Sequence, residues 1–280
     1  MQTDQKNIGM ASGRPKTIAV GVVTYNNSCS QISKLGGSLD VAIQYSKKDS
    51  NAFVLISIAN GTGDDWSSLR VRHVSLPTEG NIGFARATNR ILDAAKREGC
   101  DVLILANPDG AFHYGCLKHL LNAHGIWPND ILEARQFPEE HPKYCDPDSG
   151  LTNWSSGACM LIPLSCYEKV GGMDERFFLY MEDVDFSWRA RSAGFDVRVV
   201  PKALFSHDVV GREEDPIVVR HLLESQLKFY EKWHGPRRYI KRLRVKLGAA
   251  RTDYKSAEEI SVIDKAIRNF TRPYFGRGRW

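Results

Sequence analysis

The sequence predicts an α/β fold in which a doubly wound, mostly parallel sheet carries helices on both faces. Strands and helices alternate along the chain, the strands are unbroken apolar runs, and 280 residues suit one large domain. Apolar runs without polar alternation are typical of strands covered on both faces. Hydrophobic residues make up 42% and charged residues 25% of the chain, a composition that excludes general disorder.

The first half of the chain supplies three β-branched or aliphatic runs. They predict strands at residues 17–24, 52–58 and 101–106. Helices are predicted between them at residues 30–47 and 84–98, the second from apolar residues at helical spacing followed by Gly99. Ligands of such sheets gather at the carboxyl ends of the strands, so the loops after these strands are the candidate site.

The second half of the chain begins with a segment rich in Pro, Asp and Glu. We interpret this segment, residues 125–156, as an irregular excursion on the surface. A capping box predicts a short helix ending at Gly171. The elements predicted after it are a helix at residues 183–193, a strand at 195–200 ended by Pro201, and a last helix at 216–233.

The chain divides into a polar leader at residues 1–16, one domain at 17–235 and a helical, basic C-terminal extension at 236–280. Residues 235–280 carry 13 Lys or Arg against 4 Asp or Glu, a net charge of +9 that leaves −4 on the remainder. Cations interleaved with apolar residues suit a helix lying on an anionic membrane surface, and a solvated tail is the alternative. A nucleic-acid site is not expected beside a crevice lined by carboxylates.

The absence of a long apolar run and of an apolar leader predicts a cytoplasmic protein, attached to the inner face of the membrane if the tail binds there. The six cysteines form no C-x-x-C pair, which suits a reducing compartment.

Two polar residues at strand ends are candidates for holding a cation. Asp109 follows the strand at 101–106, where its carboxylate suits Mg²⁺ or Mn²⁺ with substrate phosphates completing the shell. A helix of about 10 residues and the strand that returns along it have similar lengths, which brings His207 beside Asp183 as a metal ligand or proton acceptor. The alternatives are an Asp in an ordinary turn and a structural histidine.

The segment Asn81–Gly83 precedes the helix predicted from residue 84. Free N–H groups and the helix dipole favour a phosphate there, and Arg86 lies within reach of a diphosphate. An ordinary loop with a solvated Arg86 is the alternative.

The richest stretch, residues 171–191, interleaves acids with aromatic residues. Glu182 and Asp183 stand at a helix start, and partial burial beside aromatic surface moves a carboxylate toward the pKa that a general base needs. Trp154 and Tyr180 are candidates to stack on an acceptor sugar, with a role in the core as the alternative.

At this point the sequence resembles a known family, the inverting family-2 glycosyltransferases of the GT-A fold, and within it bacterial rhamnosyltransferases of surface polysaccharide synthesis. The resemblance covers residues 17–235. The segments that carry it are Thr24-Tyr25-Asn26, the run 81–89, Asn107-Pro108-Asp109, the run 157–162, and the run 170–185 with Glu182-Asp183.

The resemblance implies that Asp183, beside Glu182, is the catalytic base and that Asp109 and His207 bind Mn²⁺ or Mg²⁺. It implies a nucleotide-diphosphate sugar donor, a dTDP- or UDP-sugar, and a glycan or lipid-linked glycan acceptor. The positions expected around the donor are Thr24, Tyr25, Asn26, Asn60, Asn81, Gly83, Arg86, Asn89 and Asn107.

One position departs from the family pattern. Members commonly have an acid where this chain has Ala59, and Asp64 or Asp65 is the candidate to replace it at the pyrimidine. The predicted activity is transfer of rhamnose or another hexose with inversion. The alternatives are a catalytically silent protein of the same fold that binds glycan or nucleotide sugar, and a sugar nucleotidyltransferase, for which no Gly-rich basic loop follows the first strand.

Overall fold

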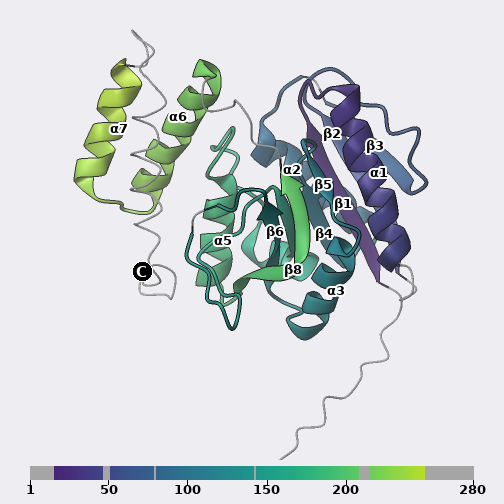
Figure 1. The fold of residues 1–280 in the computed structure, drawn as a ribbon. Helices are drawn as coiled ribbons and strands as arrows, with labels where there is room; N and C mark the ends of the chain where they lie inside the picture. Colours follow the sequence, from purple (N-terminus) through teal and green to yellow (C-terminus); the bar gives the residue numbers. More distant parts are fainter. Residues whose placement is uncertain (1–15, 47–50, 79, 142, 208–214, 250–280) are drawn as a thin grey trace, which may run out of the picture.

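A mixed, mostly parallel sheet of eight strands organises the computed structural model, which describes residues 16–46, 51–78, 80–141, 143–207 and 215–249 (Figure 1). The strand order is β3-β2-β1-β4-β7-β6-β8-β5. The strands are β1 (Thr17–Thr24), β2 (Ala52–Ala59), β3 (Arg72–Leu76), β4 (Val102–Ala106), β5 (Gly110–Phe112), β6 (Ile131–Phe137), β7 (Cys159–Pro163) and β8 (Val197–His207). β3, β2, β1 and β4 run parallel, as do β6 and β8, whereas β7 and β5 pair antiparallel to their neighbours.

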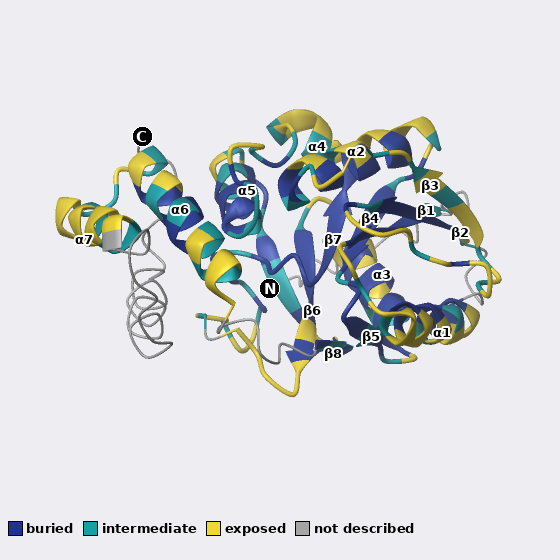
Figure 2. Cartoon of the chain, turned by 90° about the horizontal axis from the view of Figure 1, so that it is seen from above, coloured by how far each residue is buried: buried dark blue, intermediate teal, exposed yellow. Residues whose placement is uncertain are grey.

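Helices cover both faces of the sheet, which confirms the predicted fold class. The helices are α1 (Cys29–Ser46), α2 (Phe84–Arg97), α3 (Cys116–Ile126), α4 (Leu164–Val170), α5 (Glu182–Ser192), α6 (Pro216–Lys232) and α7 (Arg237–Ala249). Leu35 of α1 and Leu120 of α3 share one core cluster with Val20 of β1. Ile91 of α2 and Phe186 of α5 share a second cluster with Leu103 of β4. The sheet is therefore the buried middle layer (Figure 2).

Strand β6 corrects the prediction for residues 125–156. Part of that segment is a strand inside the sheet, paired with β7 on one side and β8 on the other. Glu133 and Gln136 of this strand are buried despite their polarity. Polar residues in the run I-L-E-A-R-Q-F concealed the strand, because a buried strand is usually recognised by an apolar run.

Strand β8 extends beyond Pro201, where the sequence predicted its end. The register shifts between β6 and β8, so that Val200 and Leu204 face adjacent residues of β6 and the intervening residues bulge out. A proline is tolerated at such a bulge because no ladder hydrogen bond is needed from its nitrogen. The continuation carries His207 to the end of β8, opposite Gly110 of β5.

Helices α6 and α7 form a pair beside the sheet (Figure 1). Asp215 caps α6 by accepting a hydrogen bond from the N–H of Ile217 at 2.8 Å. Leu243 of α7 is buried against Leu223 and Tyr230 of α6. None of the helices in the described part of the chain combines the length and apolarity of a membrane span. The predicted leader falls almost wholly outside the described residues, as does the predicted extension after residue 249.

Candidate active site

The carboxyl ends of β1, β2 and β4 lie side by side at one edge of the sheet. Thr24, the last residue of β1, pairs with Ala59 of β2, and Val22 pairs with Ala106 of β4. Parallel register therefore brings the three loops after these strands together, as the sequence predicted.

The loops after β1 and β2 form one hydrogen-bonded unit. The hydroxyl of buried Thr24 donates to Asp64 at 3.1 Å, and the carbonyl of Thr24 accepts from the N–H of Asn60 at 2.8 Å. The side-chain oxygen of Asn26 accepts from the N–H of Thr62 at 3.1 Å. Tyr25 stands at the rim with 57% of its surface exposed. An exposed aromatic ring beside fixed amide and carboxylate groups suits contact with a nucleoside.

The structure distinguishes between Asp64 and Asp65, the two candidates to replace the acid that is absent at Ala59. Asp64 contacts Thr24 at the end of β1, where the donor positions cluster. Asp65 instead accepts a hydrogen bond from the N–H of Ser67 at 2.8 Å within its own turn. Of these two acids, Asp64 is therefore the one that lies at the end of β1.

The segment before α2 joins this cluster, and the first N–H of the helix is occupied. Asn60 donates to the carbonyl of Gly83 at 3.3 Å, and Asn81 accepts from the N–H of Gly83 at 3.0 Å. The N–H of Phe84 donates to the carbonyl of Phe178 at 2.8 Å, so this donor is already used. Gly83 has φ 83°, and a Cβ there would lie 2.8 Å from the Phe178 carbonyl oxygen, which explains the glycine.

Arg86 and Asn89 of α2 contact the segment that precedes the acidic helix. Arg86 pairs with Glu175 at 2.8 Å. Asn89 accepts from the N–H of Met173 at 2.7 Å and donates to its carbonyl at 2.9 Å. Asn89 therefore holds that segment, and its contact with a diphosphate stays a prediction.

A buried polar cluster lies where β4 and β8 end. The Nε2 atom of His207 is 3.4 Å from Oδ1 of Asp109, and both side chains are less than a tenth exposed. Asn107 lies 3.2 Å from the same Nε2, and Gln136 lies 3.1 Å from Nδ1. The tautomer with Nδ1–H donating to Gln136 and Nε2 accepting from Asn107 satisfies the contacts with these two amides. In that tautomer no hydrogen lies between Nε2 and the buried Oδ1 of Asp109.

The donor set at Asp109 and His207 fits a divalent cation only in part. A buried carboxylate and an imidazole nitrogen are both metal ligands. Among the described residues, however, no group of three or more His, Cys, Asp or Glu side chains gathers to hold an ion. These residues therefore fit a cation that completes its shell with oxygens of the substrate diphosphate and water.

Asp183 is held at the start of α5. Its Oδ2 accepts from the N–H of Gly157 at 2.9 Å, and its Oδ1 accepts from the N–H of Val184 at 2.8 Å. Burial raises the pKa of Asp183 above its ordinary value, against the opposing effect of these hydrogen bonds and the charge of Lys143. Burial and the neighbouring Asp183 charge likewise raise the pKa of Glu182 well above its ordinary value. Oε2 of Glu182 is buried without a hydrogen-bond partner in the structure.

The backbone before α5 has an unusual conformation. Tyr180 and Met181 adopt φ values of 69° and 68°, in the left-handed region that residues other than glycine rarely occupy.

Tyr180 and Trp154 both pack on the aromatic cluster of Phe177 and Trp188. The two predicted acceptor residues therefore lie in one cluster beside α5.

Two adjacent residues join the Asp109 cluster to Asp183. The carbonyl of Ala158 accepts from the N–H of Asn107 at 2.9 Å, and the N–H of the preceding Gly157 holds Asp183. The two residues just before β7 thus connect the two halves of the predicted site. The sequence did not identify Gln136, Glu133 and Lys143, because their partners are distant in the chain or hidden in the missed strand β6.

Comparison with known proteins supports the resemblance. A family model described as "Glycosyltransferase like family 2" matches residues 146–236. The chain is 28% identical over 218 residues to N-acetylglucosaminyl-diphospho-decaprenol L-rhamnosyltransferase of Mycobacterium tuberculosis, an alignment that covers 60% of this chain and 71% of that protein. The chain is therefore similar to family-2 glycosyltransferases, and rhamnosyltransferases are among its relatives.

Solved structures confirm the fold. Mannosyltransferase PcManGT from Pyrobaculum calidifontis, in complex with GDP-Man and Mn²⁺, superposes with a TM-score of 0.57 at 15% identity and covers 94% of this chain and 83% of that chain. TarS of S. aureus superposes with a TM-score of 0.51 at 16% identity over 74% of this chain, which spans 39% of TarS. The sheet and its helices have the GT-A arrangement of these glycosyltransferases.

Proposed function

We propose that the chain transfers a sugar from a nucleotide-diphosphate donor to a hydroxyl of a lipid-linked glycan, with inversion at the anomeric carbon. The observation that carries the proposal is Asp183, a carboxylate of raised pKa held by the N–H of Gly157. The next residue, Ala158, accepts a hydrogen bond from Asn107, which belongs to the cluster of Asp109 and His207. A general base works best with a pKa closer to the working pH than that of a free carboxyl, and burial moves the pKa of Asp183 in that direction. The similarity to the mycobacterial rhamnosyltransferase supports rhamnose as the sugar and a polyprenyl diphosphate-linked acceptor.

In the proposed reaction Asp183 takes the proton of the acceptor hydroxyl while its oxygen forms a bond to the anomeric carbon. The bond from that carbon to the diphosphate breaks on the opposite face, so the configuration inverts. The hydrogen bonds from Gly157 and Val184 orient the carboxylate. Burial keeps the proton affinity of Asp183 high, and the charge of Asp183 in turn raises the proton affinity of the neighbouring buried Glu182.

Asp109 and His207 are the residues proposed to hold Mn²⁺ or Mg²⁺. A cation held by these two residues would supply positive charge against the departing diphosphate. The Nδ1–H of His207 is held by Gln136, so Nε2 is the atom that would bind the cation, in place of its present contact with the Asn107 amide. Thr24, Tyr25 and Asp64 are proposed to contact the nucleoside, with Asp64 taking the place of the acid that is absent at Ala59.

The exposed face of α7 is proposed to lie on an anionic membrane surface. Ile240, Leu243 and Leu247 pack toward α6, so most of the apolar residues that the sequence offered for insertion are used within the protein, and Val245 is the exposed one. The cations Arg238, Lys241 and others of this helix remain exposed. Attraction to the membrane is therefore electrostatic, at about 1 kcal/mol for each basic residue near the surface.

A thermal-shift screen followed by a transfer assay tests the proposed function. We expect dTDP- or UDP-sugars to raise the melting temperature more with Mn²⁺ than without it. Incubation with the stabilising donor and a polyprenyl diphosphate-linked N-acetylglucosamine is then expected to give a glycosylated product whose anomeric configuration, read by NMR, is opposite to that of the donor. Donor binding without transfer or hydrolysis would instead identify a silent nucleotide-sugar-binding protein.

A further inference from the structure

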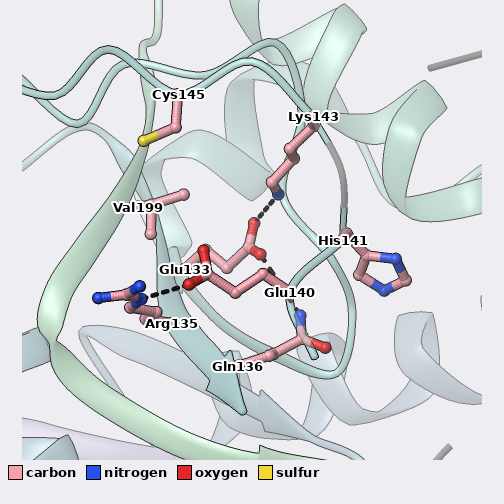
Figure 3. A pocket seen from close by; sticks show the side chains of 8 residues that line it. All are labelled: Glu133, Arg135, Gln136, Glu140, His141, Lys143, Cys145 and Val199. Carbon is pink, nitrogen blue, oxygen red and sulfur yellow. Dashed lines mark hydrogen bonds and ion pairs between the residues drawn. The ribbon is translucent and has the colours of Figure 1, made fainter. Parts of the chain in front are cut away.

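A buried ion pair, Glu133 of β6 with Lys143, lies behind the proposed site. The side chains are 4% and 5% exposed, and they line a small cavity of about 30 Å³, roughly the space of one or two water molecules (Figure 3). Burial raises the pKa of Glu133, and the neighbouring charge of Lys143 opposes that rise. Two charges in such a place are expensive to desolvate, and an apolar pair of the same volume is often as stable. Stability alone therefore does not explain the pair.

The pair holds the chain segment that leads to the base. Oε2 of Glu133 accepts from the N–H of Ser156 at 2.9 Å, and Lys143 donates to the carbonyl of Trp154 at 2.8 Å. The ammonium of Lys143 also lies 4.3 Å from the centre of the Trp154 ring. The next residue after Ser156 is Gly157, whose N–H binds Asp183. Trp154 and Ser156, two of the three residues before Gly157, are therefore hydrogen-bonded to the ion pair.

The same carboxylate reaches the other half of the site. Gln136 donates to Oε1 of Glu133 at 3.4 Å, and its own oxygen accepts from Nδ1 of His207. Figure 3 shows Glu133 between Lys143 and Gln136, with contacts to both. A displacement of Glu133 therefore acts on His207 and on the donor to Asp183 together.

We propose that the Glu133–Lys143 pair is a positioning device for the reaction, fixing residues 154–157 so that the N–H of Gly157 orients Asp183. Neither member touches the reacting atoms, so the pair acts through Gly157 and through the charge of Lys143, which lowers the pKa of Asp183. The effect on turnover rests on the proposed function, whereas the effect on geometry does not. A misplacement of about 1 Å at a reacting group costs on the order of 10²-fold in rate.

A second ion pair offers a matched control. Arg198 pairs with Asp130 at 2.6 Å, donates to the carbonyl of Ser149 at 2.8 Å, and lies 4.7 Å from the ring centre of Trp127. It thus has the same kinds of partner as Lys143: a carboxylate, a main-chain carbonyl and a tryptophan ring. Its contacts lie near the start of β6, at the opposite end of the strand from His207.

The test compares K143M, E133Q and R198M in the full chain. For K143M we expect kcat to fall by about 10- to 100-fold while the affinity for UDP or dTDP with Mn²⁺ stays within about twofold. For R198M we expect a lower melting temperature with kcat within about twofold of the wild type. E133Q keeps the size of the side chain and an acceptor for Ser156, so it provides the measurement if K143M does not fold, and its kcat is expected to fall by more than about threefold.

Two outcomes for the main comparison would overturn the proposal: a kcat of K143M within about twofold of the wild type, or an equal loss of kcat in R198M. If K143M does not fold, an unchanged kcat in E133Q would overturn it. A wild type that turns over no donor would contradict the proposed function instead. The crystal structure of K143M still tests the positioning role in that case, since the distance from the Gly157 nitrogen to Asp183 is then expected to exceed about 3.5 Å.

Discussion

Replacing Asp183 with asparagine removes the proposed base with little change in shape. The carboxylate accepts two hydrogen bonds, from the N–H groups of Gly157 and Val184. An asparagine side chain has one oxygen and one NH₂ group, so it keeps only one of these bonds and turns a donor toward the other N–H.

The structure gives the expected size of two effects of this substitution, the change in stability and the loss of kcat. Loss of one hydrogen bond to a charged acceptor costs about 1.5–3 kcal/mol. The raised pKa of Asp183 shows that burial disfavours its charge, and removing that charge offsets part of the cost. We therefore expect the melting temperature to change by less than about 5 °C, at about 2–4 °C per kcal/mol for a chain of this size. The value of kcat, by contrast, is expected to fall by about 10²- to 10⁴-fold.

The assay measures kcat, the donor dissociation constant and the melting temperature of D183N beside those of D185N. Asp185 is fully buried on the same helix, but it binds Lys232 at 2.6 Å and Trp233 at 2.9 Å. We expect D185N to be destabilised by about 3–5 kcal/mol and to keep its kcat per folded molecule, the reverse of D183N. A D183N enzyme that retains more than a tenth of wild-type kcat would refute the assignment of the base.

Three further predictions concern the rest of the site and α7. The raised pKa of Glu182 means that the folded protein binds its proton more tightly than the unfolded chain, so this stabilisation is complete below the ordinary value of 4.5 and is lost as pH rises through the folded-state pKa. E182Q should therefore melt above the wild type at pH 8, with a difference that shrinks toward pH 4; an equal difference at both pH values would contradict this. Q136L should weaken Mn²⁺ binding in the presence of UDP by about 10- to 100-fold, as measured by electron paramagnetic resonance titration, because the imidazole loses the acceptor for its Nδ1–H; unchanged affinity would remove Gln136 from the site. K241E/R242E should lose binding to phosphatidylserine vesicles by at least about 30-fold at low salt, whereas unchanged binding would exclude the α7 surface.

The sequence predicted the edge formed by the carboxyl ends of β1, β2 and β4 because each of these strands has a clear local sequence pattern. Apolar runs identified β1, β2 and β4, and their parallel register places Thr24, Asn60 and Asp109 at one edge. The acidic start of α5 was visible in the same way. Short-range pattern was sufficient wherever the strand or helix was regular and its polar residues stood at its end.

The features that the sequence did not predict depend on contacts between residues distant in the chain. Glu133 is acceptable inside β6 because Lys143, ten residues further along the chain, neutralises it, and no local pattern announces that partner. The start of α2 has the sequence of an anion site, yet Phe178 occupies its first N–H from almost a hundred residues away. Pro201 signalled a strand end, but the bulge against β6 accommodates it. In each case a residue distant in sequence reverses a local preference.

The attachment of α6 has a consequence for the order in which the protein is completed during translation. Ser225 donates to the carbonyl of Leu179 at 2.7 Å and Lys232 binds Asp174 at 2.7 Å, so α6 clamps the segment with the left-handed residues Tyr180 and Met181. About 50 residues separate the base from the end of this clamp, which at about 5–20 residues per second corresponds to roughly 3–10 s of synthesis. The nascent chain therefore exposes its acidic helix for seconds before the strained turn ahead of it can be locked, and the candidate active site is among the last parts to mature.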